Sequence, residues 1–260
     1  MSNFKPEHFL ERSWLWRLVV ALFLVGQLSF RLVKGRIYPR AFLEQFAKAG
    51  PRSLLSVILI AIAASAIFTV QTARELNRFG AIQALGGAFA LAFCRELGPV
   101  LTASIVAGQV GSAYAAELGA MRVTEQIDAL IMLGTDPIDY LVLPRAIACC
   151  LMLPLLTICA IAVGIGMGTL TARQFYNLNP WLFLRSVRSF LMPLDLLAVL
   201  LKGFLFGIVV SAIGCSWGLT TRGGAKEVGQ SATNAVVTTW IAIFFLDFFL
   251  SLILFESPVF

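Results

Sequence analysis

Histidine, phosphate-binding loops and paired carboxylates are scarce or missing in this 260-residue chain. The single histidine is His8, so a metal site or a protease centre that needs several histidines has no side chains to use. No G-x-x-x-x-G-K-[ST] loop occurs, which excludes ATP binding of that kind. No apolar segment carries a carboxylate pair suited to acid–base chemistry. We therefore expect neither an enzyme nor a cofactor or metal ion in this chain.

Charge is also scarce, whereas long hydrophobic runs are frequent. Charged residues make up 13% of the chain and hydrophobic residues 59%, while soluble domains carry about 25% charged residues. About 20 mostly apolar residues are enough to cross a bilayer. Five candidate spans fall at roughly 53–73, 81–108, 141–170, 196–216 and 235–255. The composition predicts an all-α polytopic membrane protein.

The five cysteines and the net charge of +6 have simple explanations. All five cysteines lie in apolar segments and none forms a C-x-x-C pair, which is typical of buried small side chains. Of the twenty basic residues, nine precede residue 53, and no basic patch alternates with aromatic residues as nucleic-acid binding would need. With the N-terminus in the cytoplasm, thirteen basic residues flank the spans on the inner side. Five lie in the two predicted outer loops, one between the first and second spans and the other at 171–195.

The N-terminal apolar stretch, residues 13–33, is interrupted by Arg17 and Arg31. Its charge-free part is short for a crossing, so we expect a helix that lies in the membrane interface. We divide the chain into an N-terminal cytoplasmic or interfacial amphipathic region, residues 1–50, and a transmembrane domain, residues 51–260.

The segment between the second and third spans is the most informative polar part of the chain. A helix from Met121 to Leu133 is predicted, with Gly134 as its stop and Asp136-Pro137 as the start of the next helix. On that helix an apolar side, Val123, Ile127, Leu130 and Ile131, lies opposite a charged side, Arg122, Glu125 and Asp128. This pattern fits either a solvated connector or an element that docks onto a partner.

Four charged residues fall inside predicted spans: Arg95, Glu96, Lys202 and Asp247. An unpaired charge there costs roughly 2.5–3.5 kcal/mol. A rise of about 1.5 Å per residue places Lys202 and Asp247 at matching depth, where the two can pair, and the other two deeper. Pro99 frees carbonyls near Arg95 and predicts a broken helix that faces protein or a water-filled cavity. A binding cavity and a purely structural ion pair both remain open.

Several strings resemble the MlaE family of ABC-transporter permeases. The longest is RELGPVLTASIVAGQVGSAYAAELGAMRVTEQIDALIMLGTDPIDYLVLPR at 95–145. Four shorter strings are GPRSL at 50–54, FTVQ at 68–71, RELNRFG at 74–80 and GGAKEVGQSATNAVV at 223–237. The region from GPRSL to NRFG is most similar to the branch found in cyanobacteria and chloroplast envelopes.

The resemblance implies a fold and a set of partners. The fold is an N-terminal interfacial helix followed by five transmembrane helices, with a cytoplasmic coupling helix. The partners are a second copy of the chain in a homodimer, two cytoplasmic ABC ATPase subunits that hold ATP and magnesium, and an MCE-domain lipid-binding protein. The implied cargo is phospholipid moved between membranes. The implied location is the bacterial inner (plasma) membrane, with the plastid inner envelope as the alternative.

The resemblance also assigns site residues. Those implied to bind the substrate lipid are Gln71, Arg95, Glu96, Lys202 and Asp247. Those implied to contact the ATPase are Glu117, Arg122, Glu125, Gln126 and Asp128. Gln109 and Asn234 stand where the family commonly has basic residues. A permease of a small-solute ABC importer and a non-transporting membrane scaffold remain as alternative functions.

Overall fold

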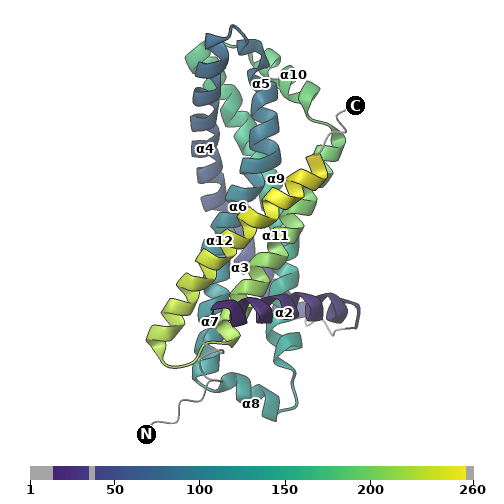
Figure 1. The fold of residues 1–260 in the computed structure, drawn as a ribbon, viewed down its shortest axis with the longest axis vertical. Helices are drawn as coiled ribbons and strands as arrows, with labels where there is room; N and C mark the ends of the chain where they lie inside the picture. The colour runs from purple at the N-terminus through teal and green to yellow at the C-terminus, as the bar shows by residue number, and fades with distance from the viewer. Residues whose placement is uncertain (1–13, 35–38, 256–260) are drawn as a thin grey trace. The chain divides into compact units, whose positions relative to one another are not determined.

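The computed structural model of the protein describes residues 14–34 and 39–255, and within these ranges the chain is helical with short connections (Figure 1). The longer helices are α2 (Trp14–Lys34), α3 (Pro39–Ala49), α4 (Pro51–Arg78), α7 (Ser112–Val123), α9 (Leu143–Tyr176), α10 (Pro180–Phe190), α11 (Pro193–Leu219) and α12 (Ala225–Phe255). The shorter segments are η1 (Ile82–Ala84), α5 (Leu85–Phe89), η2 (Ala90–Leu97), α6 (Gly98–Val106), η3 (Ala107–Gly111), α8 (Gln126–Met132) and η4 (Ile138–Val142). Of these, η2, η3 and η4 are π-helical.

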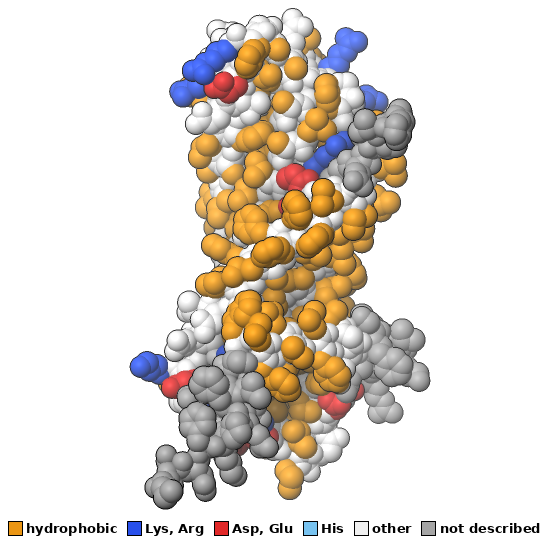
Figure 2. Space-filling view, viewed as in Figure 1, with side chains coloured by type: hydrophobic (Ala, Val, Ile, Leu, Met, Phe, Trp, Pro, Cys, Tyr) orange, Lys and Arg blue, Asp and Glu red, His pale blue; other side chains and the backbone are white. Residues whose placement is uncertain are grey.

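Five helical runs are long and apolar enough to cross a membrane, and each overlaps one predicted span. They are Ala41–Arg78, Ile82–Val123, Ile138–Tyr176, Pro193–Leu219 and Ala225–Leu254. Hydrophobic side chains cover most of the face drawn in Figure 2, and Lys, Arg, Asp and Glu are few there. The expected all-α polytopic architecture is therefore confirmed, and the chain is an integral membrane protein.

The apolar part of α2, Trp14–Gln27, is shorter than these five runs. Its interfacial placement stays a prediction, and His8 lies outside the described residues. The described chain forms two compact units that each combine distant segments. The first unit joins the described residues up to Ala49 with Val106–Cys149 and Gly207–Ala242, and the second unit contains the remainder. The division proposed at residue 50 stays a prediction.

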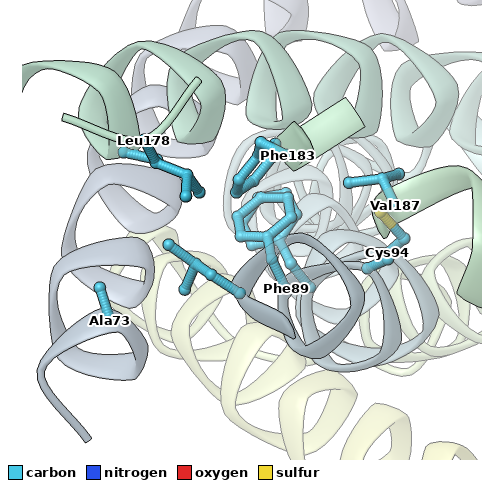
Figure 3. Packing of buried hydrophobic residues seen from close by; sticks show 10 residues of the cluster. Ala73, Phe89, Cys94, Leu178, Phe183 and Val187 are labelled. Carbon is cyan, nitrogen blue, oxygen red and sulfur yellow. The ribbon is translucent and has the colours of Figure 1, made fainter. Parts of the chain in front are cut away.

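The core of the second unit is an aromatic cluster around Phe89 (Figure 3). The Phe89 ring stacks on Phe93 with centroids 4.9 Å apart and lies 5.7 Å from the ring of Phe183. Phe183 and Val187 come from α10, so this helix of the predicted outer loop packs its apolar side on α5 and η2. Asn179 accepts a hydrogen bond from the backbone N–H of Trp181 and so caps α10.

Helix α4 joins this unit through a narrow stripe of buried side chains. The stripe recurs every fourth residue: Ser53, Val57, Ala61, Ser65, Thr69 and Ala73. These side chains are small, so neighbouring backbones approach closely. Ser65 Oγ accordingly donates to the carbonyl oxygen of Gly164 in α9 at 2.6 Å. The sequence signal for this face is the four-residue spacing of small residues on one side of a helix.

In the first unit, α2 crosses the end of α11 and the start of α12 (Figure 1). Hydrogen bonds between described residues fix it there. Trp14 Nε1 donates to Thr238 Oγ1 at 2.9 Å, and Arg17 Nη1 donates to Ser231 Oγ at 3.1 Å. Ser216 Oγ donates to the carbonyl oxygen of Arg17 at 2.8 Å. The amphipathic helix is thus fastened by its polar atoms to the helices beneath it.

The single helix expected from Met121 to Leu133 is wrong. Helix α7 ends at Val123 and α8 begins at Gln126, because Glu125 takes a left-handed conformation with φ of 59°. The other boundary predictions in this segment are confirmed. Gly134 ends the segment with φ of 75°, and Asp136 Oδ1 accepts from the N–H of Ile138 at 2.9 Å as a helix cap.

Candidate functional site

Four side chains from three helices form what we call the charge cluster: Glu96, Lys202, Asp247 and Ser251. Lys202 on α11 is fully buried, and its Nζ lies 2.6 Å from Glu96 Oε2 and 2.8 Å from Asp247 Oδ1. Ser251 on α12 accepts from Lys202 Nζ at 2.8 Å and donates to the Glu96 carboxylate. The predicted pairing of Lys202 with Asp247 is therefore confirmed.

Pro99 contributes to this cluster through the backbone. Because proline has no N–H, the carbonyl of Arg95 four residues earlier lacks its usual helical donor. That carbonyl accepts instead from Lys202 Nζ at 3.2 Å. The broken helix that we expected here is wrong, since the run Ile82–Val123 continues past Pro99. The effect of Pro99 on the preceding helix is seen in the π-helical turns of η2. Such turns are frequent at functional sites.

Arg95 forms a second ion pair in the same unit. Its Nη2 donates to Asp195 Oδ2 at 2.8 Å, and the same oxygen accepts from the backbone N–H of Met192. Asp195 therefore fixes the start of α11 and holds Arg95 at once. Together with the charge cluster, this pair gives two cationic and three anionic side chains.

The depth estimate that placed Glu96 below Lys202 is wrong, because the two side chains are in contact. The estimate counted residues from position 81 as though hydrocarbon began there. The helix after Ile82 instead starts among residues that pack on α10, part of the predicted outer loop. Asp195 and Ser251 were missed altogether. Asp195 carried one signal, an acidic residue in the first turn of a helix.

Gln71 differs from the other predicted substrate-binding residues. It lies on α4 with an exposed side chain. Among the described residues, no hydrogen bond or ion pair joins it to the charge cluster. Its role in binding stays a prediction.

A third charged group, in the first unit, surrounds Glu117. Arg145 is buried, and its Nη2 donates to Glu117 Oε2 at 2.9 Å while its Nη1 donates to the carbonyl of Leu141. Lys48 of α3 contacts the other carboxylate oxygen at 3.3 Å. Glu117 therefore ties α7 to α3 and α9, while its side chain stays 38% exposed, and its contact with a partner stays a prediction. Because Arg145 is buried, its positive charge needs a carboxylate partner, and Glu117 supplies it.

The segment from Arg122 to Leu133 presents two kinds of exposed surface. Arg122 Nη1 pairs with Asp128 Oδ1 at 2.6 Å across the bend, and Glu125 and Gln126 are exposed beside them. The tip of α8 is apolar and exposed, and consists of Ile131, Met132 and the following Leu133. Only Ile127 packs inward from α8. An exposed apolar end framed by charged groups is typical of a surface that docks onto another protein.

Comparison with known proteins gives one family and several relatives. The family model described as Permease MlaE matches residues 42–253. A probable ABC transporter permease of Synechocystis sp. is 51% identical, with 99% of this chain and 97% of the relative covered. The Protein TRIGALACTOSYLDIACYLGLYCEROL 1, chloroplastic, of Arabidopsis thaliana is 44% identical over 94% of this chain and 70% of its own length. A probable ABC transporter permease of Rickettsia prowazekii is 36% identical, with 86% and 87% covered.

Proposed function

Since the chain belongs to the MlaE family of ABC transporter permeases, we propose that it moves phospholipid between membranes, driven by a separate ATPase subunit. The chain supplies the membrane path, and ATP and magnesium bind to the partner. The observation that carries the lipid assignment is the charge cluster, a fully buried Lys202 between two carboxylates inside otherwise apolar spans.

The chemistry of the charge cluster suits one end of a phospholipid. Lys202 has three protons for four neighbouring acceptors, on Glu96, Asp247, Ser251 and the Arg95 backbone. The excess of acceptors and of negative charge favours a bound group that brings its own positive charge, as a zwitterionic headgroup does. Apolar residues on the same spans suit acyl chains.

The relatives support a lipid cargo and leave its identity to experiment. The Arabidopsis relative is a chloroplastic protein whose name contains a glycerolipid, trigalactosyldiacylglycerol. The Synechocystis and Rickettsia relatives are bacterial permeases. For this chain we propose the bacterial inner membrane, with the plastid inner envelope as the alternative.

The partners follow from the family and from α8. The exposed apolar tip of α8 is the proposed contact with the ABC ATPase, flanked by the Arg122–Asp128 pair. A homodimer of the chain would bring two such tips to two ATPase subunits. An MCE-domain protein is the proposed lipid carrier on the other side of the membrane. Substitution of Met132 at this tip tests the proposed contact with the ATPase.

The first test is native mass spectrometry of the tagged protein, extracted from its own membrane with its partners. A complex of two permease chains, two ATPase subunits and retained phospholipid is the expected result. A small solute in place of lipid would favour an ordinary importer. A chain free of both ATPase and lipid would contradict the proposal.

The second test is ATP-dependent transfer of a fluorescent phospholipid by the reconstituted complex. Arg95→Ala removes the ion pair with Asp195 and is expected to lower transfer at least about tenfold, because one charge-assisted hydrogen bond is worth roughly 1.5–3 kcal/mol. Arg78→Ala, which removes an exposed pair with Glu75, is the matched control and should leave transfer unchanged. Full transfer by assembled Arg95→Ala would remove this part of the proposal.

A further inference from the structure

A pocket of about 570 Å³ opens in the first unit, where α2 crosses the junction of α11 and α12. Trp14 and Arg17 of α2 form one wall and Trp217 of α11 another. Arg222 lies in the connection between α11 and α12. One face of α12 completes the lining, with Glu227, Gln230, Ser231 and Asn234 at helical spacing. None of the predicted substrate or coupling residues lines it.

Among the described residues that line the pocket, Arg17 and Arg222 carry a positive charge and Glu227 a negative one. Arg17 is held in place by its bond to Ser231, so its guanidinium is positioned before any ligand arrives. Arg222 is an exposed residue of the lining. Glu227 Oε2 accepts from the backbone N–H of Gly224 at 3.0 Å, so part of its acceptor capacity is used within the chain. The balance of charge favours an anion.

A second observation points the same way. Trp217 is a fully buried residue of the pocket lining, yet its Nε1 finds no hydrogen-bond acceptor among the described residues. A buried N–H without an acceptor costs about 1–3 kcal/mol. The pocket also lies at the start of the long helix α12, where the helix dipole favours negative charge. Planar guanidinium groups with further N–H donors match the geometry of phosphate oxygens.

We propose that this pocket binds the phosphate group of an anionic phospholipid or of a soluble phosphate ester, at a site separate from the charge cluster. The shared chemistry is a phosphate oxygen shell held by Arg17 and Arg222. A lipid source is favoured by α2 itself, since the helix that supplies Trp14 and Arg17 to the pocket also carries the exposed apolar side chains Leu15, Leu22 and Phe23. An amphipathic helix of this kind places neighbouring polar groups at the level of lipid headgroups. The proposal concerns binding alone and does not rest on the transport function.

The test uses the full-length protein in detergent, freed of endogenous lipid, and native mass spectrometry with phosphatidylglycerol as the probe. Arg222→Gln is expected to weaken binding at least about tenfold, the effect of one lost charge-assisted bond. Glu227→Gln removes the competing negative charge and is expected to tighten binding. Lys226→Gln is the matched control, since Lys226 is exposed one residue away from Glu227 and does not line the pocket.

Two further arms identify the source of the phosphate. Phosphatidylcholine should bind more weakly than phosphatidylglycerol, and glycerol 3-phosphate should compete poorly if the apolar side of α2 contributes. If glycerol 3-phosphate displaces phosphatidylglycerol and this displacement depends on Arg222, the pocket is a phosphate site whose ligand is a soluble phosphate ester. Equal binding by wild type and Arg222→Gln would overturn the proposal, as would equal weakening by Arg222→Gln and Lys226→Gln. A Glu227→Gln variant that folds normally and binds more weakly would also contradict it.

Discussion

Replacement of Lys202 by methionine is the sharpest test of the charge cluster. Lys202 is completely buried and contacts the carboxylates of Glu96 and Asp247. Its removal leaves two neighbouring carboxylates without their cation. Breaking a buried ion pair at one partner typically costs about 3–5 kcal/mol. We expect Lys202→Met to lower the stability of the purified protein by about this amount.

The same geometry predicts a ranking among the partners. The side chain of Asp247 is 14% exposed and that of Glu96 is 36% exposed. An ion pair with a more exposed partner contributes less to stability, because solvent screens it more. Asp247→Asn should therefore cost more than Glu96→Gln, and both should cost less than Lys202→Met. Glu75→Gln, in an exposed pair with Arg78, is the control and should change stability by less than about 0.5 kcal/mol.

The measurement is thermal unfolding in one detergent, followed by tryptophan fluorescence at a fixed heating rate, because membrane proteins often unfold irreversibly. A variant that combines Lys202→Met with Glu96→Gln and Asp247→Asn removes all three charges at once. It should recover most of the stability that Lys202→Met loses, since a neutral buried group needs no counter-charge. If Lys202→Met were as stable as wild type, or if the triple variant were no better than the single one, the assignment of an ionised, mutually dependent cluster would be refuted.

Two further predictions concern the first unit and close helix packing. Met132 is 88% exposed at the tip of α8, so Met132→Asp should lower ATP hydrolysis by the copurified ATPase, whereas Phe79→Asp, at a position 80% exposed in the predicted outer loop, should not. A Cβ added to Gly214 would lie 2.8 Å from the carbonyl oxygen of Gly111, so Gly214→Ala should destabilise the protein by about 1–3 kcal/mol in thermal unfolding. Gly166→Ala is the control: a Cβ added there would meet no atom within 4 Å, so this variant should be neutral or slightly stabilising.

Hydrophobicity alone was enough to predict the five spans, because a bilayer imposes a length and a composition on any helix that crosses it. Local cap chemistry was also readable, as Gly134 and Asp136 show. The bend at Glu125 was not predictable, since a left-handed conformation in a residue other than glycine has no sequence signature of its own.

The candidate site was only partly predictable. The pairing of Lys202 with Asp247 followed from counting residues along regular helices. The contact of Glu96 with Lys202 did not, because the second span begins among residues that pack on α10, and because η2 is π-helical. Ser251 gave no signal, since a serine in an apolar span is as readily explained by packing.

The stability of the fold does not by itself explain why the spans contain ion pairs. Replacement of a buried ion pair by neutral side chains is often neutral or stabilising, so stability alone is a weak reason to keep the three charges of Lys202, Glu96 and Asp247. A charge cluster that serves only packing predicts that the triple-neutral variant transfers lipid normally once its stability has recovered. A cluster that holds a lipid headgroup predicts a variant that is stable, assembled with its ATPase and unable to transfer lipid. The two readings of the same geometry therefore separate in one variant, by comparing its unfolding temperature with its transfer rate.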